Sequence, residues 1–214
     1  MSSSKIEKII NLLKPLYLEH SKYLLFHGWH HITFVRKKAL EFAESVSANK
    51  LVVEAAALTH DLNYIVKPNS EPEEGKELRQ KFLSKAGFTT EEIIKIETVV
   101  MESHTGTRDE KVTLEGMALS DADTLFKSLP ITPIIFAQKY ITQNKVDIYK
   151  LAHKVTSEQN PLIDSDIYFY TDYAKKRYLN WAKDNLKLWN NVIEALKDED
   201  IKEILKIAND LGVL

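Results

Sequence analysis

The stretch 58–65, LTHDLNYI, places a His-Asp pair directly after the apolar run LVVEAAAL of 51–58. Apolar residues of this run and His60 recur at helical spacing, which predicts a helix over about 50–63 with His60 on its apolar face. Burying an ionisable side chain is costly unless the group has a partner. His60 and Asp61 are therefore either metal ligands or a loop pair that follows an apolar helix.

Three other predicted helices also place an ionisable side chain on an apolar face. These are His31 in a helix over about 30–48, His104 at the end of one over about 90–104, and Asp123 in one over about 113–128. A shared cation would remove most of the cost of burying four such groups separately. The competing interpretation is a set of hydrogen-bonded core histidines and solvated aspartates, and we expect Asp121 to be solvated.

The whole chain has the pattern of an all-α protein. It contains six glycines and six prolines, shows no strong alternation of apolar and polar residues, and has apolar residues at helical spacing nearly everywhere. Gly87 is expected to cap a helix over 74–86, and Thr89 with Glu92 forms a capping box before the next helix. The other predicted segments are a helix near 4–25 kinked at Pro15, a loop over 66–75, a helix starting at Pro133, and an amphipathic segment over 163–199 with one helix or two.

Composition limits the function classes. The 214 residues carry a net charge of −2 and include no cysteine, so disulfides, thiolate metal sites and cysteine nucleophiles are excluded. The charge provides no overall field for a nucleic acid polymer or an anionic membrane. No segment reads as a secretory signal or a membrane span, so we expect a cytoplasmic protein. Any metal must be held by nitrogen and oxygen atoms.

Four motifs in this order resemble the HD-domain superfamily of metal-dependent phosphohydrolases. They are HGWHHITFV at 27–35, AAALTHDLNY at 55–64, VVMESHT at 99–105 and ALSDADTLF at 118–126. The resemblance covers roughly 24–130, and the segment at 169–189 looks like the tail helix of small bacterial members. It implies one multi-helix bundle over 1–214, with an HD-like core over about 24–130 and a C-terminal helical extension over about 131–214.

The resemblance also implies a ligand set. The metal ligands of the family fall on His31, His60, Asp61 and Asp123, with His31 preferred to the adjacent His30 by the residues that follow it. Two imidazoles and two carboxylates suit one divalent ion such as Mn²⁺, Fe²⁺, Co²⁺, Ni²⁺ or Mg²⁺. Binding of a second metal ion is left open as an alternative. One ion is favoured because the adjacent histidine pair of the cyclic dinucleotide phosphodiesterases is missing, as is their Ile-Gly-Lys after His-Asp.

Catalytic and substrate-binding residues are assigned as hypotheses on the same basis. Asp61 would take a proton from a metal-activated water, and His104 would donate to the leaving oxygen or hold the phosphate. His27 and Lys67 are the candidate substrate-binding residues. Arg79 and Arg177 could also neutralise phosphate, although a solvated surface position is the favoured interpretation for each of them.

The leading hypothesis is a metal-dependent phosphohydrolase that cleaves a small phosphate ester, with nucleotides among the candidates. One alternative is a metal-stabilised binding or regulatory domain without turnover, and another is a di-iron oxygenase on the same scaffold. A small phosphorylated substrate is the expected partner. The aromatic residues of 168–189 favour core packing or a homodimer interface over a stacking platform for a nucleobase.

Overall fold

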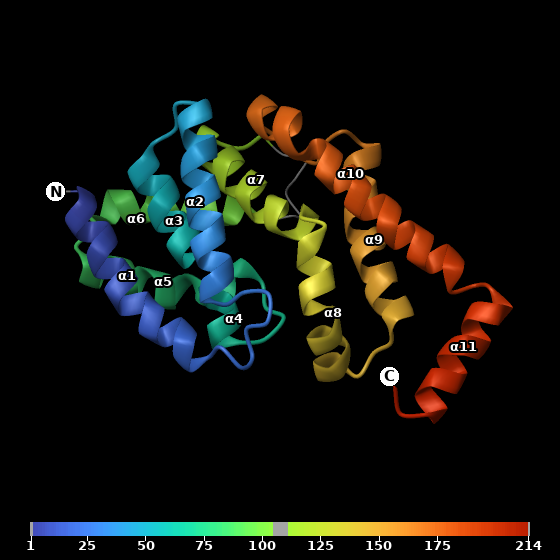
Figure 1. The fold of residues 1–214 in the computed structure, drawn as a ribbon. Coiled ribbons are helices and arrows are strands. Elements are labelled where there is room, and N and C mark those ends of the chain that lie inside the picture. Colours follow the sequence, from blue (N-terminus) through green and yellow to red (C-terminus); the bar gives the residue numbers. More distant parts are fainter. Residues whose placement is uncertain (1, 105–110, 214) are drawn as a thin grey trace. The chain divides into compact units, whose positions relative to one another are not determined.

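The computed structural model describes residues 2–104 and 111–213, and within these ranges every regular element is helical (Figure 1). The prediction of an all-α fold is confirmed. The chain forms two compact units, one of 1–127 with 167–179 and the other of 128–166 with 180–214. The expectation of one domain over 1–214 stays a prediction.

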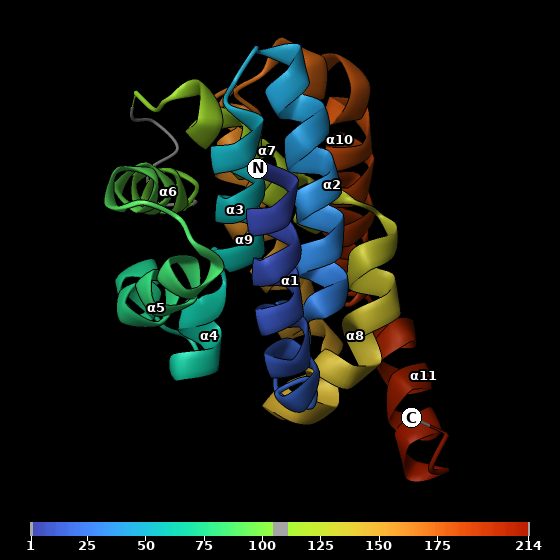
Figure 2. The ribbon, with the colours of Figure 1, turned by 90° about the vertical axis from the view of Figure 1, so that its left-hand side faces the viewer.

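The first unit contains the helices that carry the predicted site. Figure 2 shows α1, α2 and α3 side by side, and α2 packs against α3 along their length. The unit also includes the first part of α10, up to Leu179. Its other elements, in chain order, are α1 (Ser2–Glu19), α2 (Trp29–Ser45), α3 (Lys50–Thr59), α4 (Leu62–Val66), the 3-10 helix η1 (Pro72–Gly75), α5 (Lys76–Ala86), α6 (Thr90–Glu102) and α7 (Leu114–Ser128).

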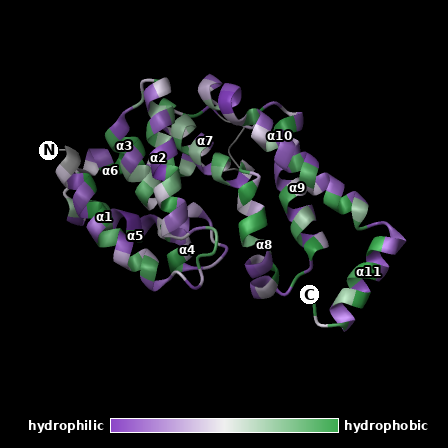
Figure 3. Ribbon diagram, viewed as in Figure 1, coloured by the Kyte–Doolittle hydropathy of each residue, from purple (hydrophilic) through white to green (hydrophobic). Residues whose placement is uncertain are grey.

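Amphipathic helices build the core of this unit. Hydrophilic and hydrophobic residues alternate along the helices in Figure 3, as expected when one face of each helix packs inward. Val35 and Phe42 of α2 are fully buried, as are Val53 and Ala56 of α3. The small alanine side chains of α3 allow neighbouring helices to approach its backbone closely.

Local capping sets several helix ends as predicted. The Thr89 hydroxyl accepts from the backbone N–H of Glu92, and the Glu92 carboxylate accepts from the backbone N–H of Thr89, which confirms the capping box. Gly87 ends α5 with φ of 91°, a left-handed conformation that glycine adopts without a Cβ clash. Asn49 caps α3 by accepting from the backbone N–H groups of Leu51 and Val52.

Several predicted helix boundaries differ from the structure. The first helix ends at Glu19 instead of continuing to 25, and the helix expected over 50–63 breaks after Thr59. His60 and Asp61 form the turn between α3 and α4, and Asp61 has φ of −95° and ψ of 13°. Because the turn points both side chains to the same region, the break helps to build the site.

A buried carboxylate joins α7 to the segment that precedes α10 (Asp172–Ala195). The expectation that Asp121 is solvated is wrong, because this residue is 0% exposed. Its carboxylate accepts from the backbone N–H of Tyr170 at 2.7 Å and from that of Thr171 at 2.8 Å. These charge-assisted hydrogen bonds stabilise the helix that carries Asp123 two residues later.

A second buried charge holds the segment after α4. Arg79 is 0% exposed and binds the Glu97 carboxylate of α6, with its Nη2 at 2.7 Å from Oε2. Its Nη1 donates to the Pro72 carbonyl at 2.7 Å. The solvated position considered for Arg79 is therefore wrong, and the guanidinium is committed to an internal ion pair. It stabilises the connection between α4 and α5.

The second unit has a small core of its own. Its elements are α8 (Ile131–Asn144), α9 (Ile148–Asp164), the rest of α10 and α11 (Glu199–Asp210). The predicted segment over 163–199 therefore contains the end of α9, the whole of α10 and the first residue of α11. Buried side chains of α9 and α10 form the core, namely Leu151, Ala152, Val155, Trp189 and Ile193.

Candidate metal centre and adjoining pocket

The four residues predicted as metal ligands lie together in the first unit. His31 comes from the first turn of α2, His60 and Asp61 from the turn after α3, and Asp123 from the middle of α7. His31 Nε2 lies 3.1 Å from His60 Nε2, 3.1 Å from Asp61 Oδ2 and 3.3 Å from Asp123 Oδ1. His30, which was considered in place of His31, is exposed.

The spacing of these atoms fits a divalent ion. Bonds of about 2.1 Å in an octahedral site place adjacent ligand atoms about 3 Å apart. His60 Nδ1 lies 3.0 Å from the Ala57 carbonyl, which fixes the ring hydrogen on Nδ1 and leaves the Nε2 lone pair available. The two facing Nε2 atoms can share at most one hydrogen, whereas a cation accommodates both lone pairs. Two imidazoles and two carboxylates therefore suit a borderline or hard divalent metal.

The charges of the cluster are strongly coupled. Burial alone would lower the pKa of His31, but the carboxylates of Asp61 and Asp123 outweigh it and raise this pKa to about 9. Burial raises the pKa of Asp61, but the nearby rings of His60, His27 and His31 hold it well below its usual range. In the metal-free protein the cluster thus keeps both carboxylates ionised and a proton on His31. A divalent ion would take the place of that proton.

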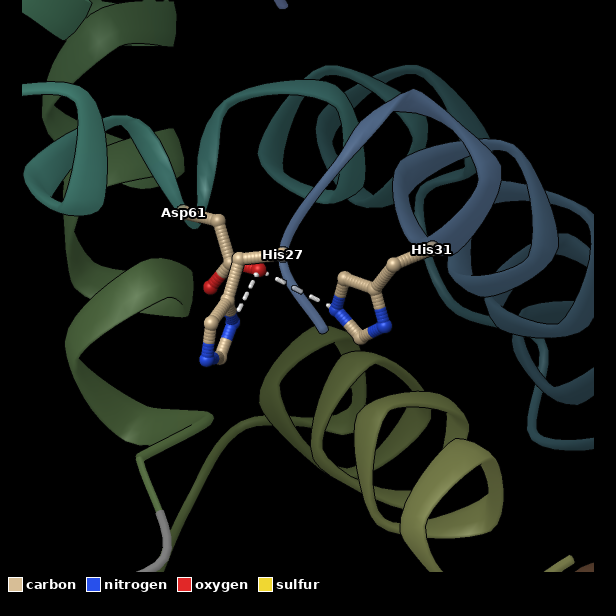
Figure 4. A group of neighbouring side chains, drawn as sticks. All are labelled: His27, His31 and Asp61. Atoms are coloured by element: carbon tan, nitrogen blue, oxygen red, sulfur yellow. Dashed lines mark hydrogen bonds and ion pairs between the residues drawn. The ribbon is translucent and has the colours of Figure 1, made fainter. Parts of the chain in front are cut away.

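His27 lies against the carboxylate of Asp61. Its Nδ1 is 2.8 Å from Asp61 Oδ2, and Figure 4 shows His27 and His31 directed to this carboxylate from two sides. The His27 ring stacks on Tyr64 with centroids 3.7 Å apart. Two triads have ligand spacing, His27 with His31 and Asp61, and His31 with His60 and Asp123. Because both include His31, they describe one centre with His27 at its edge.

A small open pocket adjoins this centre. It encloses about 420 Å³, solvent at its mouth included, and residues from the His-Asp turn, α4, α6 and α7 line it. Beyond the metal-ligand candidates, its polar lining comes from His27, Asn63, Tyr64, Ser103, His104 and Lys127.

The two remaining predicted site residues have different surroundings. His104 lies just after the end of α6 and lines the pocket, but its side chain is 41% exposed, and its Nε2 is 3.5 Å from Glu71 Oε2. The expectation that it points into the core is therefore wrong. Lys67 lies outside the pocket lining, where its exposed ammonium pairs with Glu74 at 3.3 Å.

Lys127 is a pocket residue that the sequence motifs did not single out. Its Nζ lies 3.1 Å from Asp123 Oδ2, on the side of the carboxylate away from the histidines. The nearby Asp123 carboxylate raises the pKa of Lys127, which therefore keeps its charge at neutral pH. The position four residues after Asp123 is the signal that could have identified it, since residues i and i+4 share a helix face.

Solved structures with a similar fold place the chain among known proteins. Bacillus subtilis YpgQ in complex with ADP is 20% identical, with a TM-score of 0.66 over 94% of this chain and 98% of that chain. An HD-superfamily hydrolase from Bacillus thuringiensis is 21% identical, with a TM-score of 0.62 over 93% and 98% of the respective chains. A Lactobacillus plantarum protein is 18% identical, with a TM-score of 0.67 over 90% and 95%.

The chain therefore shares the all-helical fold of these solved structures, one of which is an HD-superfamily hydrolase. At the level of the fold, this agrees with the resemblance seen in the motifs. No protein-family model matches the sequence, and no curated protein matches it. Among the residues described, none of the helices combines the length and the apolar character needed to cross a membrane.

Proposed function

We propose that this protein is a metal-dependent phosphohydrolase that cleaves a small phosphate ester. The observation that carries the proposal is the convergence of one atom each from His60, Asp61 and Asp123 within 3.3 Å of His31 Nε2, beside an open pocket. This donor set is suited to one divalent ion. The same arrangement gives a ligand access to the centre from the pocket side.

Nucleotides are the substrates that we propose to test first. YpgQ, which has a similar fold, was crystallised in complex with ADP. At least one protein of this architecture therefore binds a phosphorylated ligand. The aromatic ring of Tyr64 and the imidazoles of His27 and His104 line the pocket. They supply flat apolar surface and hydrogen-bond donors, a combination found in many small-molecule sites.

The proposed roles of the chain's own residues follow from the geometry. His31, His60, Asp61 and Asp123 would hold the ion, which supplies Lewis acidity toward a water and a phosphoryl oxygen. Asp61 lies both at the centre and in the pocket lining, so we assign it the uptake of a proton from the attacking water. His104 also lines the pocket, and we assign it a hydrogen bond to the leaving oxygen or the phosphate.

A panel of phosphate esters tests this function. The metal-loaded protein is incubated with nucleoside mono-, di- and triphosphates and with p-nitrophenyl phosphate, in the presence of Mn²⁺, Mg²⁺, Co²⁺ or Ni²⁺. Asp61→Ala is the variant expected to be inactive. Glu54→Gln, whose side chain on α3 pairs with Arg36 and not with the site, is the control that should stay active. Hydrolysis that depends on metal and on Asp61 supports the proposal.

The opposite result favours the second candidate. If metal binds through Asp61 while no ester is cleaved by the unmodified protein, the hydrolase proposal fails, and a binding or regulatory domain becomes the better interpretation. A di-iron oxygenase would require about two iron ions per chain, which elemental analysis of the same samples would reveal.

A further inference from the structure

The metal-loaded centre has no excess charge of its own. The two carboxylates of Asp61 and Asp123 balance a divalent ion, and the imidazoles of His31 and His60 bind it as neutral ligands. A phosphate monoester carries up to two negative charges at neutral pH. A charge-neutral centre in a partly desolvated pocket would attract such a ligand only through the open positions of the metal. Selective binding of the anion therefore needs a further cation.

Lys127 is suitably placed to supply that charge. Its Nζ bonds Asp123 Oδ2 at 3.1 Å, while Asp123 Oδ1 faces the histidines, so the ammonium lies at the edge of the ligand cluster. The residue lines the pocket together with Tyr64 and His104. Its side chain is 40% exposed. An ammonium has three donors, so it can bond a carboxylate and a further oxygen at the same time.

The other charged groups of the site do not perform this task. The His27 ring is committed to Asp61 through a 2.8 Å contact. His104 faces the Glu71 carboxylate at 3.5 Å, which compensates any charge that its imidazole gains. Arg79 is buried in its pair with Glu97, and Lys67 lies outside the pocket with Glu74. Among the residues that the structure describes, Lys127 is thus the cation in the pocket wall next to the metal ligands.

We infer that Lys127 is the substrate-anion residue of this site, binding a phosphoryl oxygen with its ammonium while it holds Asp123, and thereby selecting dianionic phosphate over less charged esters. This inference rests on the proposed function in that a phosphate ester occupies the pocket. A lysine suits the role because a compact ammonium on a flexible stem can bond two oxygens in different directions. The selected substrate class is a terminal phosphate group rather than a phosphodiester.

Binding of inorganic phosphate tests the inference without requiring turnover. Isothermal titration calorimetry measures the dissociation constant of phosphate for the protein saturated with Mn²⁺, and a separate titration measures that of Mn²⁺. Lys127→Met should weaken phosphate binding about 10- to 100-fold, the loss expected for one charge-assisted hydrogen bond. Lys127→Arg, which keeps the charge, should recover most of the affinity. Lys95→Met, on the exposed side of α6, is the matched control and should bind as the unmodified protein does.

The same experiment separates an anion-binding residue from one that only orients Asp123. If Lys127→Met lowers the affinity for Mn²⁺ but leaves phosphate binding to the saturated protein unchanged within about twofold, the inference is overturned. An unmodified, metal-saturated protein that binds no phosphate also overturns it. Circular dichroism of each variant confirms that it is folded, and Lys127→Gln provides a second neutral variant should the methionine variant not fold.

Turnover, where it occurs, gives an independent readout. The ratio of kcat/KM for p-nitrophenyl phosphate to that for bis(p-nitrophenyl) phosphate should fall at least about tenfold in Lys127→Met. An unchanged ratio contradicts the inference. If the protein binds phosphate through Lys127 but hydrolyses no ester, the proposed function fails while the assignment of Lys127 stands.

Discussion

The histidine at the centre of the cluster makes the stability of the metal-free protein depend on pH. In the folded protein His31 is buried, which lowers its pKa, but Asp61 and Asp123 outweigh burial and raise it to about 9, compared with an ordinary value of 6.5. A proton on His31 therefore stabilises the folded state relative to the unfolded state. Because the folded pKa is the higher one, this stabilisation is complete below pH 6.5 and is lost as the pH rises through about 9.

The size of the effect follows from the same two pKa values. Each pKa unit corresponds to about 1.36 kcal/mol, so the difference between 6.5 and about 9 corresponds to about 3 kcal/mol of unfolding free energy. This is a large share of the stability of a typical domain, about 5–15 kcal/mol. A divalent ion replaces the proton on His31. The unfolding free energy of the metal-loaded protein should therefore not decrease in this way as the pH rises.

Urea unfolding at several pH values measures the effect directly. We expect the unfolding free energy of the chelator-treated protein to fall by about 3 kcal/mol between pH 6 and pH 10. The His31→Gln variant, which lacks the titrating ring, should lose this decrease, and the difference between the two proteins removes the contribution of other groups. A difference that is flat with pH, or that grows as the pH rises, would refute the assigned coupling of His31 to the two carboxylates.

Three further outcomes can be measured. The affinity for Mn²⁺ should rise about tenfold per pH unit below pH 9, because the metal displaces one proton from His31, and titration calorimetry in buffers of different ionisation enthalpy counts that proton. Arg79→Ala should lower the unfolding free energy by about 3–5 kcal/mol in urea, since it leaves Glu97 buried without its partner; a loss below 1 kcal/mol would contradict the buried pair. Gly75→Ala should cost about 1–3 kcal/mol, because its Cβ would lie 2.6 Å from the Asn63 backbone nitrogen.

Periodicity predicted much of the site from the sequence. The apolar stripes of two helices place His31 and Asp123 on inward faces, and the structure has both residues in the cluster. The capping box at Thr89 and the cap at Gly87 were also predictable, because each depends on a few neighbouring residues. Such local patterns need no knowledge of the rest of the fold.

The errors arise where a partner lies far away in the sequence. Asp121 was expected in solvent because the backbone N–H groups that bind it belong to 170–171, about fifty positions later. Arg79 was considered a surface cation because Glu97 is on a different helix. Tertiary placement, which periodicity does not encode, decides each case.

Metal stoichiometry tests the central claim most directly. Elemental analysis and calorimetric titration with Mn²⁺ should give one ion per chain for the unmodified protein. His60→Ala and Asp123→Ala should each abolish this binding, while Glu54→Gln retains it. Binding of one ion that survives both His60→Ala and Asp123→Ala would contradict the assigned centre, and so would an unmodified protein that binds no divalent ion.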